Sequence, residues 1–266
     1  MNLQIDELVS NRSQWYDMYY PNYNFINYMD YTKFDTKTYT ETATSYDAGL
    51  RNYMVGVYKH MAIALLITAV VSMMAASSQA FMQLLFATPL KWIVMFAPLA
   101  IALYMGVKFH TMPANTVQTL LYVYGGAMGL SLAFIFLVYT GESIARTFLI
   151  TASTFGAMSI YGYTTKRDLT AFGSFLMMGV MGIVIASLLN IFMQSSALGF
   201  AISILSVVLF TGLTAYDVQR IKEIYFQVSG SKEDESKMAV YGALQLYMDF
   251  INLFIALLRF FGDRKE

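Results

Sequence analysis

Two acidic residues, Asp217 and Asp249, stand inside segments that otherwise have the composition of membrane-spanning helices. A charged side chain near the bilayer centre costs at least roughly 2.5 kcal/mol on insertion scales, so we expect both to face a bundle interior or a water-filled path. Two carboxylates that meet at low dielectric cannot both ionise easily, and they would titrate in coupled steps. The pair predicts a proton-operated switch, closed while a proton is shared and open or cation-binding once it is lost.

Polar side chains near the aspartates predict how the pair is oriented. On the last helix, Gln245, Asp249 and Asn252 recur at the spacing of one helical face, and Thr214 precedes Asp217 by three residues. If the last two helices form an antiparallel hairpin, with the last one beginning near residue 238, the aspartates lie at similar depth. We therefore expect one polar stripe on each helix, facing inward.

A structural alternative needs no switch. Each aspartate could fasten two helices by pairing with a cation at a helix end, such as Arg220 or Lys222. The spacing alone leaves this alternative and the switch equally open.

The composition fixes the solvent in which these residues act. Hydrophobic residues make up 57% of the chain and charged residues 13%, with a mean hydropathy of +0.51. Soluble domains are about 25% charged, so we predict a membrane protein in contact with lipid. Basic and acidic residues balance at 17 each, which gives no field that would attract nucleic acid.

The residue types give no support for an enzyme or a bound cofactor. The chain has no cysteine, only two histidines and no glycine-rich phosphate loop. Neither His60 nor His110 has a second ligand at metal spacing, so we expect side chains at the membrane interface. We predict no catalytic residues and no resident metal or cofactor.

Charge-free apolar runs predict seven membrane helices, because each is long enough to cross about 30 Å of hydrocarbon. They lie at about residues 60–76, 92–107, 116–139, 147–163, 171–192, 197–216 and 238–258, within a domain of residues 51–266. Inside the third run, Gly125 and Gly129 form a GxxxG pattern, for which packing within one chain is favoured over dimer formation. The fold class is therefore an all-α membrane protein with seven transmembrane helices.

Basic residues predict the orientation of these helices. Lysine and arginine favour the cytoplasmic loops, and here they gather in alternate loops. Those loops carry Lys108, Lys166, Arg167, Arg220, Lys222, Lys232 and Lys237. We expect a cytoplasmic N-terminus and a C-terminus on the opposite side.

Residues 1–50 are of a different composition, rich in Tyr, Asn, Asp and Thr, without a sustained helical or alternating period. We predict a mostly disordered cytoplasmic tail, with a docking peptide for a partner as the functional alternative. Residues 47–59 predict a short interfacial helix that leads into the first span.

Five segments resemble the signatures of the Bax-inhibitor motif family of seven-helix membrane proteins. The most specific are FTGLTAYDVQRIK (residues 210–222) and LYMDFINLFIALLRFFG (246–262). Further similarity lies in residues 47–71, 129–140 and 153–169, whereas the N-terminal tail carries no such resemblance. The resemblance implies that the last helix is central and wrapped by the other six, and that Asp217 and Asp249 form the latch of a pH-controlled calcium leak. Calcium would be the permeating ion, bound transiently by these two carboxylates.

Bacterial members of this family suggest two further expectations, in addition to a location in the bacterial inner membrane. In some members a basic residue at the cytoplasmic end of the second helix pairs with a latch carboxylate, and here only Lys108, or less plausibly His110, stands at that place. Others bind and restrain a membrane-anchored ATP-dependent quality-control protease, an alternative function in which the tail would be the recognition element.

Overall fold

The computed structural model describes residues 36–265, with side chains from Ala48 onward, and the regular structure in that part of the chain is helical. The chain divides into two compact units, Met1–Ala48 and Gly49–Glu266, and most of the described residues belong to the second. The helices are α2 (Thr36–Ala76), α3 (Gln79–Phe86), α4 (Leu90–Lys108), the 3-10 turn η3 (Phe109–Thr111), α5 (Ala114–Leu132), α6 (Ile135–Val138), α7 (Gly141–Thr164), α8 (Thr170–Met193), α9 (Ser196–Val228) and α10 (Lys232–Phe261).

Six helical segments in the described residues are long and apolar enough to cross a membrane. They are Ala48–Ala76, Leu90–Thr111, Ala114–Val138, Thr170–Met193, Ser196–Val228 and Lys232–Phe261. Helix α7 is also 24 residues long but is not among them. All seven segments expected from the sequence contain helix, and six of them coincide with these candidate spans.

The start of the chain differs from the sequence expectation. Residues 1–35 of the expected tail lie outside the described residues, so its disorder stays a prediction. Helix α2 begins at Thr36 and continues to Ala76 without a break, so residues 47–59 are part of one long helix instead of a separate interfacial one.

The third expected helix is interrupted near its end. Helix α5 ends at Leu132, and the N–H of Ala133 donates to the carbonyls of Gly129 and Leu130. Only the four residues of α6 follow before Tyr139 becomes extended and pairs with Arg264. The expected helix over residues 116–139 is therefore present as one candidate span, Ala114–Val138, with a local break at Ala133 and Phe134, and the contacts of the C-terminus coincide with its end at Val138.

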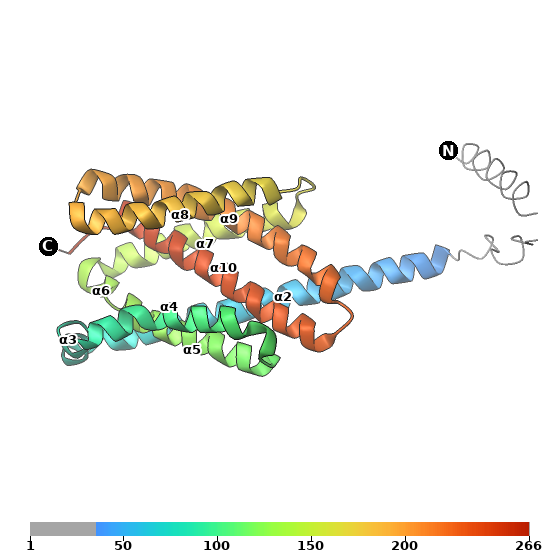
Figure 1. Cartoon of the computed structure of the whole chain (residues 1–266), viewed down its shortest axis with the longest axis horizontal. Coiled ribbons are helices and arrows are strands. Elements are labelled where there is room, and N and C mark those ends of the chain that lie inside the picture. Colours follow the sequence, from blue (N-terminus) through green and yellow to red (C-terminus); the bar gives the residue numbers. More distant parts are fainter. Residues whose placement is uncertain (1–35, 266) are drawn as a thin grey trace, which may run out of the picture. The chain divides into compact units, whose positions relative to one another are not determined.

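Helix α10 packs against α9, α7 and α5, while α8 packs on α9 and α4 on α5. Figure 1 shows α10 running obliquely between the α8–α9 pair and the α4–α5 pair. In the most apolar 18-residue stretch of each helix, 61% is buried for α10 but only 6% for α8. The last helix therefore contributes most to the core, and α8 exposes nearly all of its apolar surface.

Close helix contacts rely on small residues. A Cβ atom added to Gly125 of α5 would lie 2.9 Å from the carbonyl oxygen of Ala64 in α2, and one added to Gly129 would lie 2.8 Å from that of Thr68. The GxxxG pattern thus packs α5 on α2 within one chain, as expected.

Helix α7 buries a stripe of mostly small, hydroxyl-bearing residues. The buried positions recur every three or four residues and are Ser143, Thr147, Thr151, Phe155, Ser159 and Gly162. Because α7 packs on both α9 and α10, this stripe faces the two helices that carry the aspartates.

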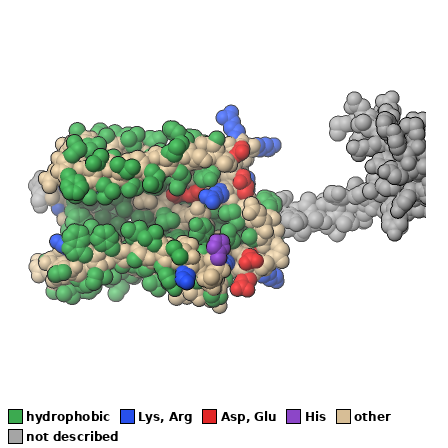
Figure 2. Space-filling model, viewed as in Figure 1, with side chains coloured by type: hydrophobic (Ala, Val, Ile, Leu, Met, Phe, Trp, Pro, Cys, Tyr) green, Lys and Arg blue, Asp and Glu red, His purple; other side chains and the backbone are tan. Residues whose placement is uncertain are grey.

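Large apolar side chains are exposed along most helices, for example Val107, Phe192 and Leu66. Figure 2 shows hydrophobic side chains over the length of the visible face and charged ones gathered toward its ends, chiefly the right end. This distribution is typical of a protein whose sides face lipid.

Candidate functional site

The two intramembrane aspartates meet between α9 and α10. The carboxyl groups of Asp217 and Asp249 lie close enough to interact electrostatically with each other. Asp249 is only 5% exposed, whereas Asp217 is half-buried. Asp249 is therefore buried inside the helix bundle, whereas Asp217 is partly exposed at the surface of the bundle.

The register that brings them together differs from the one expected. Helix α10 begins at Lys232 instead of near residue 238, because Ser231 caps its first turn and that turn carries Glu233, Asp234 and Glu235. Asp249 is consequently more residues away from the α9–α10 turn than Asp217 is.

One carboxyl oxygen of the pair is short of a donor. Oδ2 of Asp249 is buried and has no hydrogen-bond partner among the described residues. An ionised carboxylate only accepts hydrogen bonds, so two ionised aspartates cannot satisfy one another. A single proton held between them supplies a donor, and a bound cation would serve the same purpose.

The expected supporting residues behave differently from one another. Gln245, one turn before Asp249, also has a buried side-chain oxygen without a donor in the described chain. Thr214 is fully buried, but its hydroxyl donates to the carbonyl of Phe210 at 2.8 Å within α9. It therefore does not donate to the aspartates.

Asn252 was expected on the inward face with Gln245 and Asp249, and this expectation was wrong because its side chain is exposed. Helical spacing places the three residues on one side of α10, but it cannot say how wide a strip of that side the neighbouring helices cover. Leu253 and Ala256, farther along the helix, are buried, so Asn252 lies at the edge of the covered strip and not beyond its end.

The basic neighbour of the pair is Arg220, which interacts electrostatically with Asp217 from one turn farther along α9. Lys108 is exposed at the end of α4 and makes no side-chain hydrogen bond or ion pair within the described part of the chain. Lys222 donates to the carbonyl of Tyr163 at 2.9 Å instead of to an aspartate. In this structure Lys108 does not act as the latch partner.

Sequence reasoning missed Gln219, which is buried two residues after Asp217. Its side-chain oxygen accepts from the N–H of Leu169 and its amide donates to the carbonyl of Arg167, each at 2.8 Å. Gln219 thereby fixes the α7–α8 connection against α9. The sequence signal that could have identified Gln219 is its uncharged amide side chain two residues after Asp217, which was predicted to be functional.

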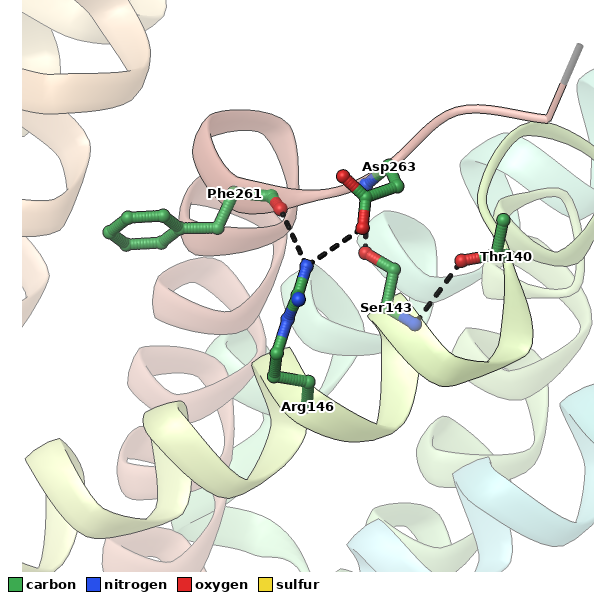
Figure 3. A network of polar contacts seen from close by, with 5 residues as sticks. All are labelled: Thr140, Ser143, Arg146, Phe261 and Asp263. Atoms are coloured by element: carbon green, nitrogen blue, oxygen red, sulfur yellow. Dashed lines mark hydrogen bonds and ion pairs between the residues drawn. The ribbon is translucent and has the colours of Figure 1, made fainter.

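A second missed network ties the C-terminus to the start of α7 (Figure 3). The guanidinium of Arg146 lies 2.8 Å from the carboxylate of Asp263 and also donates to the carbonyl of Phe261. The N–H of Asp263 donates to Ser143, whose own N–H donates to the hydroxyl of Thr140. This network holds the end of α10 next to α7.

The carboxylate pair is a poor resident metal site. No group of three or more His, Cys, Asp or Glu side chains comes together within residues whose side chains are described. Calcium takes about six to eight oxygen ligands, more than two carboxylates and a neighbouring amide oxygen provide. The arrangement suits proton exchange and brief contact with a passing cation.

Long apolar helices, an apolar exterior and a buried carboxylate pair define a multi-pass, all-helical membrane protein. A family model described as "Inhibitor of apoptosis-promoting Bax1" matches residues 50–266, and the chain belongs to this Bax inhibitor family.

Several bacterial proteins resemble the chain over most of its length. An uncharacterised protein of Rickettsia prowazekii is 49% identical and aligns over 90% of this chain and all of its own length. Another from Caulobacter vibrioides is 45% identical over 84% of this chain and 92% of its own. The inner membrane protein YbhL of Escherichia coli is 46% identical over 82% of this chain and 94% of its own.

The Rickettsia match also reaches the N-terminal segment. It covers 90% of the chain, more than residues 50–266 contain, so part of the sequence before residue 50 is shared with that protein. The family model itself begins at residue 50, in agreement with the expectation that the tail does not resemble the family's signatures.

Proposed function

We propose that this protein is a pH-sensitive leak channel for calcium or related cations, gated by Asp217 and Asp249. The observation that supports the proposal most is the interaction between the two carboxyl groups, which lie between α9 and α10. In addition, one buried oxygen of Asp249 has no hydrogen-bond donor among the described residues. Such a pair is costly to keep in a membrane helix, and proton or ion pathways are the usual reason for retaining one.

The latch follows from the electrostatics of the pair. A shared proton lets one carboxyl donate to the other and holds α9 against α10. When it leaves, two like charges face each other, and unit charges about 4 Å apart repel by about 4 kcal/mol at an effective dielectric constant near 20. The helices then separate or a cation enters, so cation flux rises with pH.

Calcium is the permeating ion in this proposal. The two carboxylates, with the side-chain oxygen of Gln245 one turn away, would replace part of its water shell as it passes. Arg220 beside Asp217 would oppose tight binding of the cation, which favours release over retention.

The architecture that we propose has seven crossings with α10 at the centre. Helix α7 spans about 36 Å at 1.5 Å per residue, enough for the hydrocarbon core. Its hydroxyl-bearing stripe lowers its hydropathy, but this stripe is buried against α9 and α10, so lipid would meet only its apolar side. The extensive burial of α10 supports its central position.

Seven crossings put the termini on opposite sides of the membrane. The alternating basic loops favour a cytoplasmic N-terminus. Because the similar E. coli protein is named an inner membrane protein, we place this chain in the inner membrane of a bacterium.

The test is calcium flux into liposomes that contain the purified protein, measured from pH 5 to pH 8. We expect flux to rise with pH, and Asp217→Asn and Asp249→Asn each to abolish most of the pH dependence, because an amide cannot lose the proton. Glu142→Gln removes an exposed acidic group at the start of α7 and serves as the matched control.

Flux equal to that of empty liposomes throughout this range would remove the channel and favour the protease-restraining alternative. One observation already supports a role for the tail, namely that the Rickettsia match includes part of it. Deleting residues 2–45 would then abolish capture of the protease while the aspartate variants retained it.

A further inference from the structure

Tyr247 ties the last helix to the opposite side of the bundle. It is 0% exposed, and its hydroxyl lies 2.7 Å from Oγ1 of Thr68 in α2. The edge of its ring meets the ring of Tyr124 in α5, with the centroids 5.4 Å apart and the planes at 72°. A single side chain of α10 thus contacts both helices of the α2–α5 pair.

The hydrogen-bond partners fix the direction of this tie. Oγ1 of Thr68 also lies 2.9 Å from the carbonyl of Ala64 and 2.8 Å from that of Gly125. A hydroxyl has one proton, and only a carbonyl partner requires that Thr68 donate it. Tyr247 is therefore the donor to Thr68, and Thr68 donates to a carbonyl.

Thr68 is held on a rigid support. The glycines of α5 let α2 approach so closely that a Cβ atom on Gly129 would lie 2.8 Å from the carbonyl oxygen of Thr68 and 2.9 Å from Cβ of Val71. Displacement of Thr68 would require these two packed helices to separate. The hydrogen bond between Tyr247 and Thr68 therefore fixes the position of α10 relative to the α2–α5 pair.

Tyr247 and Asp249 project from opposite sides of α10, because two residues correspond to about 200° of helical rotation. One side is bonded to α2 and the other meets Asp217 of α9. We propose that Tyr247 is a positioning residue for the latch: its hydrogen bond to Thr68 holds α10 in the rotation that presents Asp249 to Asp217. This inference rests on the proposed function for its effect on flux, but not for its effect on the position of α10.

Few ionisable groups surround the elements of this proposal. Asp217 and Asp249 interact with each other and with Arg220 of α9, and Tyr247 is faced by Tyr124 of α5. The residues that α7 buries toward α9 and α10 carry no ionisable group, α8 carries no Asp, Glu, Lys or Arg, and the residue of α2 that contacts Tyr247 is Thr68. His60 of α2, whose ring nitrogen lies 2.8 Å from the hydroxyl of Tyr122 in α5, is a further titratable group in the α2–α5 pair. A change of flux with pH in variants of Tyr247 is therefore assigned to the aspartate pair only where Asp249→Asn removes it.

The experiment compares Tyr247→Phe, Thr68→Val and the double variant in the liposome assay. At pH 5, where the wild-type latch is closed, we expect each single variant to raise flux by roughly three- to tenfold, the population shift that one ordinary hydrogen bond provides. The double variant should add little to the larger single effect, because both changes remove the same bond. Thr68→Ser keeps the hydroxyl and should restore wild-type behaviour.

Tyr124→Phe is the matched control, since it removes a hydroxyl from the neighbouring buried ring without removing a partner of Thr68. A second readout does not depend on flux. The chain has no cysteine, so spin labels on Leu66→Cys in α2 and Asn252→Cys in α10, both exposed positions, report the distance between these helices alone. We expect one distance at pH 5 in the wild-type background and a second population when Tyr247→Phe is added.

The outcomes separate the two proposals. Suppose that the second distance population appears, but calcium flux with the wild type and with every variant equals that of empty liposomes. The leak channel is then wrong, whereas the role of the Tyr247–Thr68 hydrogen bond in positioning α10 is supported. If neither Tyr247→Phe nor Thr68→Val changes flux at pH 5 or the distance distribution, the positioning role of Tyr247 is overturned.

Discussion

At the scale of single residues, the two aspartates differ in their burial. Asp249 is 5% exposed and Asp217 is half-buried, so in the proposed latch a proton would leave the pair through Asp217. Arg220, one turn from Asp217, adds a positive charge on that same side. Under the proposed function, exchange of the proton and contact with a cation would therefore take place mainly at Asp217, with Asp249 as its buried counterpart.

Sequence patterns identified the pair but not all of its surroundings. The cost of a charge in lipid selected Asp217 and Asp249 without any structure. The exposure of Asn252 and of Lys108 depends on which sides of α10 and α4 the neighbouring helices cover, which spacing within one helix does not encode. The same applies to Thr68 and Tyr247, because their bond joins residues 179 positions apart.

A residue outside the membrane spans gives a pH-dependent prediction. Hydrogen bonds from the Thr170 side chain and N–H lower the pKa of Asp168, which precedes α8. A lowered pKa means that the ionised carboxylate stabilises the folded state above its ordinary pKa and that this contribution is lost as pH falls through the lowered value. Asp168→Ala should therefore speed amide hydrogen exchange in the first turn of α8 at pH 7, with the difference from wild type vanishing in strong acid.

Asp168→Asn retains an acceptor oxygen without the charge and serves as the control. Its exchange rates should fall between those of the wild type and Asp168→Ala, and their ratio to Asp168→Ala should not vary with pH. An exchange difference between wild type and Asp168→Ala that is equal at neutral and strongly acidic pH would contradict the role of the charge.

At the scale of elements, the contact of α7 with α9 depends on close backbone approach. Gly162 of α7 lies against the backbone of Ala215, two residues before Asp217. Any Cβ atom there would push α7 away from the helix that carries the latch. The packing around Asp217 and Asp249 thus requires a glycine at position 162 of α7, although no charged residue of α7 interacts with the two aspartates.

Gly162→Ala should lower the free energy of unfolding by roughly 1–3 kcal/mol, the usual cost of overpacking. Gly156→Ala on the same helix is the matched control, because an added Cβ there meets no atom within 4 Å. Thermal unfolding in detergent measures both. Equal melting temperatures for the two variants would show that α7 adjusts freely to α9.

The helices themselves were largely predictable, and the exceptions have identifiable causes. Apolar runs located the long helices because lipid demands length and low charge. Helix α3 was missed because its eight residues are too short to signal a span, although Ser78 caps its first turn. The break after α5 was missed because neither Ala133 nor Phe134, the two residues at which it occurs, is a Gly or Pro that would signal it.

At the scale of the whole unit Gly49–Glu266, the chain closes on itself at its C-terminus. The backbone N–H of Thr140 donates to the carbonyl of Asp263, and the N–H of Lys265 donates to that of Val138. The Arg146–Asp263 ion pair lies outside these bonds, with side chains 51% and 68% exposed. The main-chain bonds, more than the ion pair, fasten the end of α10 to the α6–α7 region.

Asp263→Ala should therefore change the stability by less than about 1 kcal/mol, as exposed ion pairs usually do. Removing residues 262–266 deletes the main-chain bonds as well, and it should lower the melting temperature clearly more. Both variants are compared by thermal unfolding of the detergent-solubilised protein. A larger loss from Asp263→Ala than from the truncation would contradict this division of roles.

The hydroxyl stripe of α7 bears on how the protein is made. Its partners, α9 and α10, leave the ribosome only after α7 has been synthesised. In the proposed arrangement of seven crossings, the buried face of α7 has no helices to shield it from lipid until they arrive, so its stable insertion would follow the synthesis of the rest of the chain.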